Sequence, residues 1–413
     1  MVTAAIRRAL RSSIEDQAAY AGDSPLDTSL MNGCGAVLGL GESRRPVRIG
    51  IDGRRLGPRL KGIGRYIWEL CKSLDSILPT AQFFLYSPKR LNLPVISPRW
   101  SLRVDGSPLG RRLENNVWLV ARAGMMSWRD NLDAFWAGTG LLPLIGLKTR
   151  GVLTVHDLMH RVAPETMNLN ALWAARLFFS RSLAKADAIV SNSAGTAHRL
   201  EASFGYKAAA VVRPGLSRVF QPRSASQTRA ALVRYRVSQP YLLGVSTWEP
   251  RKGLELLIRA FRRMKAGGAI PNHTLLLVGE RGWKDSSIIE LARDSESIVS
   301  LGFVDDISLA ALYSGTDAFI YPSTYEGFGM PVLEARACGA RVVTSDIPEL
   351  REAGGDDAIY VAPTEQGIYS GISLAVEAAA PKPVDWRDWN WTLSASVLAE
   401  VLLDHAYTES KLA

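Results

Sequence analysis

Residues 321–339 read YPSTYEGFGMPVLEARACG, which combines the features of a buried strand, a glycine loop and a helix start. The apolar, aromatic run at 318–321 is typical of a strand in a parallel sheet. Gly327 and Gly329 predict a loop that allows close backbone approach, and Pro331 suits the first position of a helix because its nitrogen carries no hydrogen. Free N–H groups at such a helix start bind anions at the carboxyl edge of an open α/β sheet. The stretch therefore predicts an α/β fold with a ligand site at this edge.

Two carboxylates belong to the same stretch. Glu326 falls in the predicted loop and Glu334 in the first turn of the predicted helix, so both can face one polyhydroxylated ligand. A structural interpretation stays open, in which the glycines shape a tight turn and Glu334 complements the positive end of the helix dipole.

Short apolar runs alternate with helical patterns on both sides of this stretch. The expected strands are 47–52, 82–86, 132–136, 151–155 and 188–191 in the first half, and 241–245, 274–278, 298–303, 318–321, 341–344 and 358–361 in the second. Strands that alternate with helices form parallel sheets with right-handed crossovers. We therefore expect two successive α/β domains.

The limits of these domains follow from changes in composition. Residues 1–46 lack sustained periodicity, and the polar, proline-containing stretch 221–228 is typical of a linker. The predicted division is a tail at 1–46, an N-terminal domain at 47–220, a C-terminal domain at 238–392 and a final helix within 393–413.

The bulk composition of the 413 residues narrows the function classes. A net charge of +9 favours an acidic partner, which can be a nucleic acid, an anionic membrane surface or a phosphorylated ligand. Cys34, Cys71 and Cys338 lack metal-binding spacing and fit a reducing compartment. Neither a secretory signal nor an apolar run of membrane-spanning length is evident, so we expect a cytoplasmic chain.

Two further loops have the chemistry of phosphate sites. Gly62, Ile63 and Gly64 follow the first strand and precede a helical pattern, although a bare glycine pair also forms simple tight turns. Arg251 and Lys252 follow the 241–245 strand and offer a forked donor beside a point charge, a combination that suits a diphosphate. The alternative is a solvated charge pair that caps a helix.

Two other features allow two interpretations each. His156 ends the 151–155 strand, where active-site residues collect in doubly wound sheets, but a single histidine is also commonly structural. The region 111–129 interleaves Trp, Met and Leu with Arg at helical spacing. It either lies on a membrane or packs on its own domain with solvated arginines.

Taken in order, these motifs resemble the retaining nucleotide-sugar glycosyltransferases of family 4. The resemblance rests on EPRKG at 249–253, on the two glutamates within YEGFGMPVLEA, and on shorter motifs, namely GIGRY at 62–66, VHDL at 155–158, SNS at 191–193, VGE at 278–280 and WTLSA at 391–395. It covers most of the chain from 47 to 405. It implies the GT-B fold, in which two Rossmann-like domains face each other across a cleft, and a final helix that packs back toward the N-terminal, acceptor-binding domain.

The resemblance also implies roles for the candidate residues. Glu326 would accept hydrogen bonds from the donor sugar, and Glu334 would hold the ribose hydroxyls. Arg251 and Lys252 would stabilise the charge that grows on the leaving diphosphate, and His156 would lie near the transferred sugar.

The remaining implied donor contacts come from loops of both domains. They are Gly62, Ile63, Gly64, Ser246, Phe303, Val304, Phe328, Gly329 and Met330. Many relatives carry an arginine at the position of Ser246, so either Arg251 takes over its task or the phosphate is held less tightly.

The implied function is a retaining hexosyl transfer to a lipid-linked or polysaccharide acceptor in cell-surface glycan synthesis. Similarity of residues 62–66 and 326–331 to bacterial mannosyltransferases favours GDP-mannose as donor, with UDP-sugars as alternatives. No aspartate cluster suggests a metal cage, so we expect a metal-independent reaction without a cofactor beside the donor.

Other classes remain as alternatives. They are a sugar-nucleotide epimerase, a phosphorylase of similar two-lobed fold, and a non-catalytic anion-binding module. Nucleic acid is not expected as a partner, because the basic residues are dispersed and no nucleic-acid motif is present. The basic region 111–129 and the acceptor class together predict a peripheral position on the anionic inner face of the plasma membrane.

Overall fold

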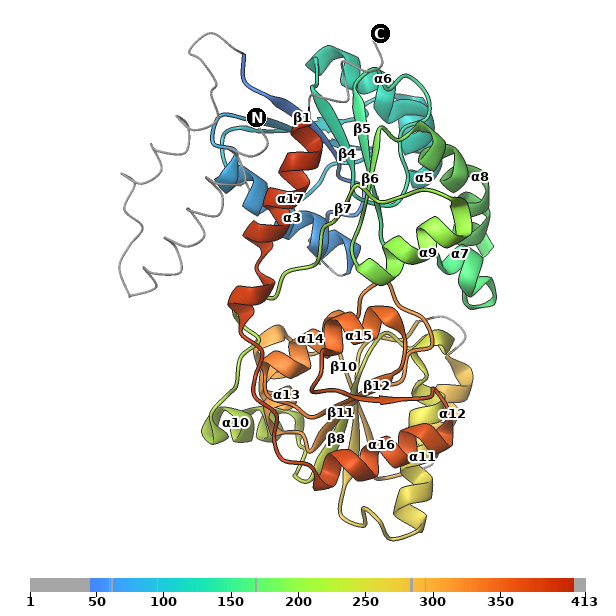
Figure 1. Cartoon of the computed structure of the whole chain (residues 1–413), viewed down its shortest axis with the longest axis vertical. Helices are drawn as coiled ribbons and strands as arrows, with labels where there is room; N and C mark the ends of the chain where they lie inside the picture. Colours follow the sequence, from blue (N-terminus) through green and yellow to red (C-terminus); the bar gives the residue numbers. More distant parts are fainter. Residues whose placement is uncertain are drawn as a thin grey trace, which may run out of the picture.

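The protein contains two parallel sheets, each covered by helices on both faces (Figure 1). The computed structural model describes residues 45–58, 60, 62–94, 96–167, 169–282, 285–293 and 295–404. The predicted tail at 1–46 lies almost entirely outside these ranges, as does the end of the chain beyond residue 404. The expected α/β class with two parallel sheets is confirmed.

The first sheet has seven strands in the order β3-β2-β1-β4-β5-β6-β7. These strands are β1 Arg48–Asp52, β2 Gln82–Ser87, β3 Trp100–Val104, β4 Ala134–Ala137, β5 Arg150–Val155, β6 Ala188–Ser191 and β7 Ala210–Val211. Its principal helices are α3 Ile63–Ile77, α7 Met159–Val162, α8 Leu169–Lys185 and α9 Ala194–Phe204. Neighbouring residues of the central strand β4, Phe135 and Trp136, point to opposite faces and are both fully buried, which is why such strands are apolar on both faces.

The second sheet has six strands in the order β10-β9-β8-β11-β12-β13. These strands are β8 Tyr241–Val245, β9 Thr274–Val278, β10 Ile298–Gly302, β11 Ala318–Tyr321, β12 Val342–Ser345 and β13 Ile359–Val361. The helices are α10 Ala225–Tyr235, α11 Leu254–Ala266, α12 Ser286–Arg293, α13 Asp306–Gly315, α14 Met330–Ala337, α15 Pro348–Gly354 and α16 Glu365–Glu377.

The strand order reverses once in each sheet, and this reversal positions the loops that matter for function. In the second sheet β8 pairs in parallel with β11, although β9 and β10 lie between them in the sequence. The carboxyl ends of β8 and β11 therefore lie side by side at a topological switch point, where the chain leaves the two strands in opposite directions. Doubly wound sheets bind ligands at such points.

The last described helix crosses back to the first domain. Helix α17, Trp391–Leu403, packs beside α3, as the red and blue helices of Figure 1 show. Ala395, Leu398 and Leu402 of α17 are buried in the same hydrophobic cluster as Leu70 and Leu74 of α3. The first domain is thus completed by the end of the described chain.

Two sequence-based expectations about local structure are wrong. The stretch 221–228 is not an open linker, because α10 begins at Ala225. Ser224 and Gln227 form a capping box, in which each side chain bonds the other residue's backbone N–H, so the polar composition marks a helix start. The strands β3 and β7 were also not expected.

The region 111–129 packs on its own domain, the second of its two interpretations. It consists of short helical segments, among them α5 Asn115–Trp118 and the π-helical turn Leu119–Ala123. Trp118 and Leu119 are fully buried, and Arg122 forms an ion pair with Asp105 at 3.0 Å. Trp118, Leu119 and Val120 are buried in the core while Trp128 remains 48% exposed, which favours the packed interpretation, and the membrane-lying interpretation stays a prediction.

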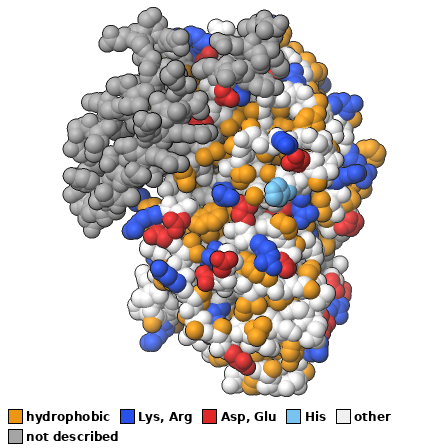
Figure 2. Space-filling model, viewed as in Figure 1, with side chains coloured by type: hydrophobic (Ala, Val, Ile, Leu, Met, Phe, Trp, Pro, Cys, Tyr) orange, Lys and Arg blue, Asp and Glu red, His pale blue; other side chains and the backbone are white. Residues whose placement is uncertain are grey.

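Charge and hydropathy on the surface are mixed. On the face shown in Figure 2, positive and negative side chains alternate and do not gather into one basic patch. Within the described ranges, none of the helices has the length and apolar character needed to cross a bilayer.

Candidate active site

The loops after β8 and β11 are tied together by hydrogen bonds to the backbone of Arg251. A single 3-10 turn, Pro250–Lys252, follows β8. The carbonyl oxygen of Arg251 accepts hydrogen bonds from the Thr324 N–H at 2.8 Å and from the Ser323 hydroxyl at 3.1 Å. The basic turn after β8 and the glycine-containing loop after β11 are therefore connected to each other.

Glu326 stands at the centre of these two connected loops. Its Oε1 lies 2.5 Å from Lys252 Nζ, and its Oε2 lies 3.1 Å from Arg251 Nη1. The Ser323 and Tyr321 hydroxyls also donate to Oε1, at 2.6 and 2.8 Å. In this structure both carboxylate oxygens are thus paired with cations, whereas the sequence assigned Glu326 to the hydroxyls of the donor sugar.

The charges of the cluster are set by burial and by their mutual proximity. Burial alone would raise the pKa of Glu326, but the Lys252 and Arg251 charges outweigh it and lower this pKa to about 2. Burial lowers the pKa of Lys252, against the attraction of Glu326. The Glu326 carboxylate is therefore ionised and is the counter-ion of Lys252 and Arg251 in this structure. The same two cations have the charge needed to bind a phosphate group.

Glu334 lies on α14, whose first residue is Met330, with Gly329 before it in the left-handed region at φ 105°. Because the helix begins at Met330, Glu334 lies in its second turn and not in the first turn that the sequence predicted. The alternative that Glu334 complements the helix dipole therefore loses its basis, since that effect is confined to the first turn.

The environment of Glu334 favours its neutral form. Glu334 is 8% exposed, and burial raises its pKa to about 8, although the nearby Arg65 charge opposes this shift. Arg65, on α3 of the first domain, pairs with Asp306 at the start of α13 at 2.9 Å. Helix α3 and its preceding Gly62 therefore face the part of the second domain that holds Glu334.

We expect Glu334→Gln to stabilise the protein increasingly as pH rises from 5.5 to 8.5. Between the ordinary carboxyl pKa and about 8, the folded chain holds a proton on Glu334 that the unfolded chain has lost. Stability from this group is therefore fully present at low pH and falls by up to ~1.4 kcal/mol per pH unit across this window. The amide of Gln stays neutral and avoids this loss.

Thermal unfolding at a series of pH values, without nucleotide, measures the effect. Glu201→Gln is the matched control, because Glu201 is an exposed glutamate with a surface partner, Lys207. A melting-temperature difference between Glu334→Gln and the wild type that does not change with pH would contradict the prediction.

His156 lies where the two domains meet. Its side chain is 9% exposed, and its Nε2 lies 2.7 Å from the Gly138 carbonyl oxygen. Since a carbonyl oxygen only accepts, Nε2 carries the hydrogen and Nδ1 keeps its lone pair. Burial lowers the pKa of His156, and the Tyr66 ring meets it edge-on at 5.0 Å between centroids. The histidine is therefore a neutral, oriented group.

The loop that contains Glu326 packs against the backbone of His156, directly after β5. A Cβ on Gly327 would lie 2.0 Å from the His156 carbonyl oxygen, so only glycine fits. The Ser193 and Thr196 hydroxyls donate to the Gly327 carbonyl oxygen at 2.7 and 3.1 Å, and Tyr325 Oη accepts from the Leu158 N–H at 2.5 Å. The structure thus brings the two predicted halves of the site together.

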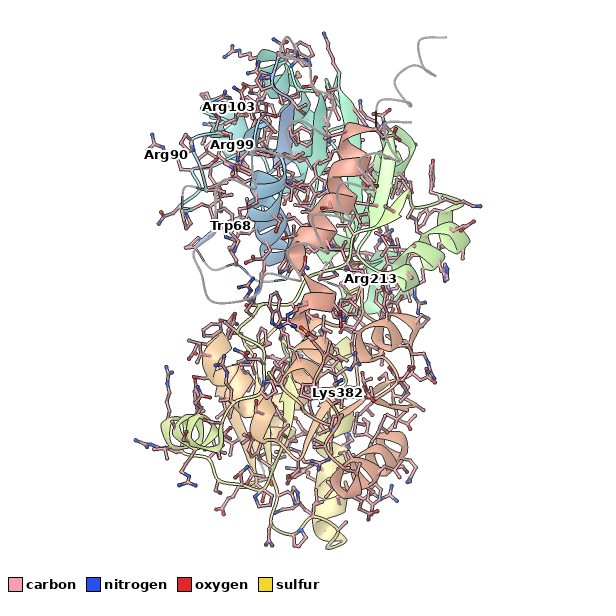
Figure 3. The ribbon with its side chains drawn as sticks, turned by 60° about the vertical axis from the view of Figure 1, so that its left-hand side comes forward. Trp68, Arg90, Arg99, Arg103, Arg213 and Lys382 are labelled. Atoms are coloured by element: carbon pink, nitrogen blue, oxygen red, sulfur yellow. The ribbon has the colours of Figure 1, made fainter. Side chains whose placement is uncertain are left out.

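Ion pairs between α9 and α15 hold the same junction. Arg199 pairs with the fully buried Glu349 at 2.6 Å, and Glu352 accepts from the Ala194 N–H at 2.7 Å. Arg213 pairs with Glu352 as well, and Figure 3 shows Arg213 at the junction of the domains. Sequence reasoning missed these contacts, for which no local motif gives a signal.

The other predicted donor contacts differ in accessibility. Phe328 and Val304 are 4% exposed and belong to the core. Phe303 is 65% exposed just after β10, and the Ser246 hydroxyl is buried after β8. Within the described ranges, no three His, Cys, Asp or Glu side chains gather as a metal site. Metal independence itself stays a prediction.

Comparisons with known proteins agree with this geometry. Residues 239–376 match the family described as Glycosyl transferases group 1. The chain is 32% identical over 324 residues to O-antigen chain mannosyltransferase B of Escherichia coli, an alignment that covers 74% of this chain and 84% of that relative.

Two solved structures share the fold. WaaG, a glycosyltransferase involved in lipopolysaccharide biosynthesis, superimposes with a TM-score of 0.63 at 15% identity, over 88% of this chain and 98% of WaaG. HepE of Anabaena in complex with UDP-glucose gives a TM-score of 0.59 at 18% identity, over 88% of this chain and 98% of HepE. These likenesses confirm the GT-B arrangement that the sequence motifs implied. By its fold and by its identity to the O-antigen mannosyltransferase, the chain belongs to the group 1 glycosyltransferases.

Proposed function

We propose that this protein is a retaining mannosyltransferase that moves mannose from GDP-mannose to a lipid-linked or polysaccharide acceptor in cell-surface glycan synthesis. The observation that carries the proposal is the buried cluster of Glu326 with Lys252 and Arg251 at the carboxyl ends of β8 and β11. Similarity to an O-antigen chain mannosyltransferase supports mannose as the transferred sugar.

The cluster is suited to a diphosphate leaving group. Lys252 is 9% exposed and Arg251 is held by Glu249 at 3.1 Å, so both cations are fixed before a donor arrives. Cations that are oriented in advance stabilise developing negative charge without the cost of reorganisation. When the diphosphate binds between them, Glu326 gains freedom to accept hydrogen bonds from the sugar, while Glu334 accepts from the ribose.

Transfer with retention proceeds in this proposal by attack on the face from which the diphosphate leaves. The acceptor oxygen forms a bond to the anomeric carbon, and the bond from that carbon to the phosphate oxygen breaks with its electron pair going to the diphosphate. The acceptor proton moves to a phosphate oxygen. His156, neutral and oriented by Gly138, positions the sugar or acceptor beside this centre.

A donor screen tests the proposal directly. The protein is incubated separately with GDP-mannose, GDP-fucose, UDP-glucose and UDP-galactose. The rate of nucleotide release from GDP-mannose should exceed the rate from each of the other donors by about tenfold or more. The anomeric configuration of the product, read by NMR, should match that of the donor, and excess chelator should leave the rate unchanged. Faster release of UDP from UDP-glucose, the ligand of the HepE structure, would overturn the GDP-mannose assignment.

The proposal includes a peripheral position at the inner face of the plasma membrane, where a lipid-linked acceptor is found. In segment 111–129 Trp118, Leu119 and Val120 are buried and only isolated apolar side chains such as Trp128 are exposed, so a larger exposed apolar surface of the first domain suits the contact better.

A further inference from the structure

Helix α8 exposes a stripe of large apolar side chains. Leu169, Trp173 and Leu177 are 72%, 69% and 51% exposed. Residues four positions apart lie on the same face of a helix, so these three side chains form one continuous stripe. Elsewhere, helices such as α10 and α16 expose single large apolar residues, Val233 and Leu374. The stripe is therefore a feature of α8 and not of the surface in general.

The charges on helix α8 itself have one sign, and the exposed Glu165 lies in the turn before it. Helix α8 contains Arg176, Arg181 and Lys185 and no acidic residue. Arg176 and Arg181 are exposed. Arg176 comes three residues after Trp173 and Arg181 four residues after Leu177, so one arginine lies on each side of the stripe. The neighbouring helix α7 adds Val162, which is 42% exposed, and Arg161. An apolar stripe flanked by arginines matches the interface of an anionic bilayer, where Trp and Leu enter the acyl boundary and guanidinium groups reach the headgroups.

The position of α8 suits this occupant. After His156, which follows β5, the chain forms α7 and a 3-10 turn at Pro164–Thr166 before α8, and Figure 1 shows α8 on the outer edge of the first domain with α7 beside the junction of the domains. A protein partner is a poorer match, because a stable protein interface buries about 800 Å² on each side, more than one narrow stripe supplies.

We propose that the Leu169–Trp173–Leu177 face of α8, with Arg176 and Arg181, docks the first domain on an anionic lipid bilayer. This docking places the strand end of His156 close to the headgroup layer from which a lipid-linked acceptor enters. The inference rests on the proposed function in one respect, namely that the acceptor is lipid-linked.

Co-sedimentation with vesicles tests the docking. The full chain should sediment with vesicles of phosphatidylcholine containing a third of phosphatidylglycerol, and much less with phosphatidylcholine alone or at high salt. Trp173→Ser combined with Leu177→Ser should weaken the partition to the anionic vesicles by about tenfold or more, since two large apolar side chains no longer enter the bilayer. Arg176→Gln combined with Arg181→Gln should reduce binding and its dependence on salt.

The matched control is Val233→Ser combined with Leu374→Ser, which removes two comparably exposed apolar side chains from the second domain and should leave vesicle binding unchanged. All variants should release GDP from GDP-mannose at the wild-type rate with a water-soluble acceptor, because none of these residues belongs to the sugar site. This readout separates failure of the docking from failure of the proposed function.

Three results would overturn the docking. They are absence of wild-type binding to the anionic vesicles, equal binding by the α8 variant and its control, and a concentration-dependent dimer that the α8 substitutions abolish. The last result would assign the stripe to a second copy of the chain.

Discussion

Replacing Lys252 with alanine should lower the turnover of sugar transfer by about a hundredfold or more, the effect typical of removing one preorganised charge partner of a transition state. Lys252 Nζ is held by Glu326 at 2.5 Å and by the Tyr321 hydroxyl at 2.8 Å, so its position does not depend on the donor. Its loss removes positive charge from the leaving diphosphate and leaves Glu326 buried with one cation, Arg251.

The rate with saturating GDP-mannose measures this effect, and a direct titration with GDP measures donor affinity separately. The rate should fall more than the affinity for GDP, because the charge on the diphosphate is greatest in the transition state. Lys72→Ala, which removes an exposed lysine paired with Glu69, serves as control. Wild-type turnover of the Lys252 variant, with an intact fold by circular dichroism, would remove Lys252 from the site.

Changing Gly327 to alanine should have an effect of similar size for a different reason. The added methyl group would lie 2.0 Å from the His156 carbonyl oxygen, and that oxygen belongs to the backbone at the end of β5 and cannot swing aside. The donor loop and the first domain must then move apart. A displacement of about one ångström between reacting groups costs about a hundredfold in rate.

Steady-state kinetics and GDP titration together identify this cause. Turnover should fall while GDP still binds, because the basic turn and Glu334 lie in the second domain alone. Gly106→Ala is the control, since a Cβ there meets no atom within 4 Å. Unchanged turnover of Gly327→Ala would show that the close approach of the two domains is not needed for transfer.

The alternation of strands and helices could be predicted because central strands buried on both faces become short apolar runs. The edge strand β3 escaped prediction because its side chains are only partly buried, so its sequence WSLRV lacks a continuous apolar run. The two-residue strand β7 is too short for any periodicity. Ser224 and Gln227 have the spacing of a capping box, but the polar residues and proline around them equally fit a linker.

The sequence places the candidate residues in loops at the carboxyl ends of strands, but it does not predict how they pair with one another. Lys252 and Glu326 are 74 positions apart, and they meet because β8 and β11 are neighbours in the sheet. Local sequence carries no information about that neighbourhood. The same holds for Glu349, which is fully buried and pairs with Arg199 of the other domain.

The return of α17 to the first domain has a consequence for synthesis of the chain. Three of its side chains, Ala395, Leu398 and Leu402, pack in the same hydrophobic core as Ile67 and Leu74 of α3. On the ribosome, the first domain exposes this unfinished patch until the whole second domain has been translated. The second domain can therefore reach its final form first, although it is made later, because the first domain waits for a helix that is translated after the second domain.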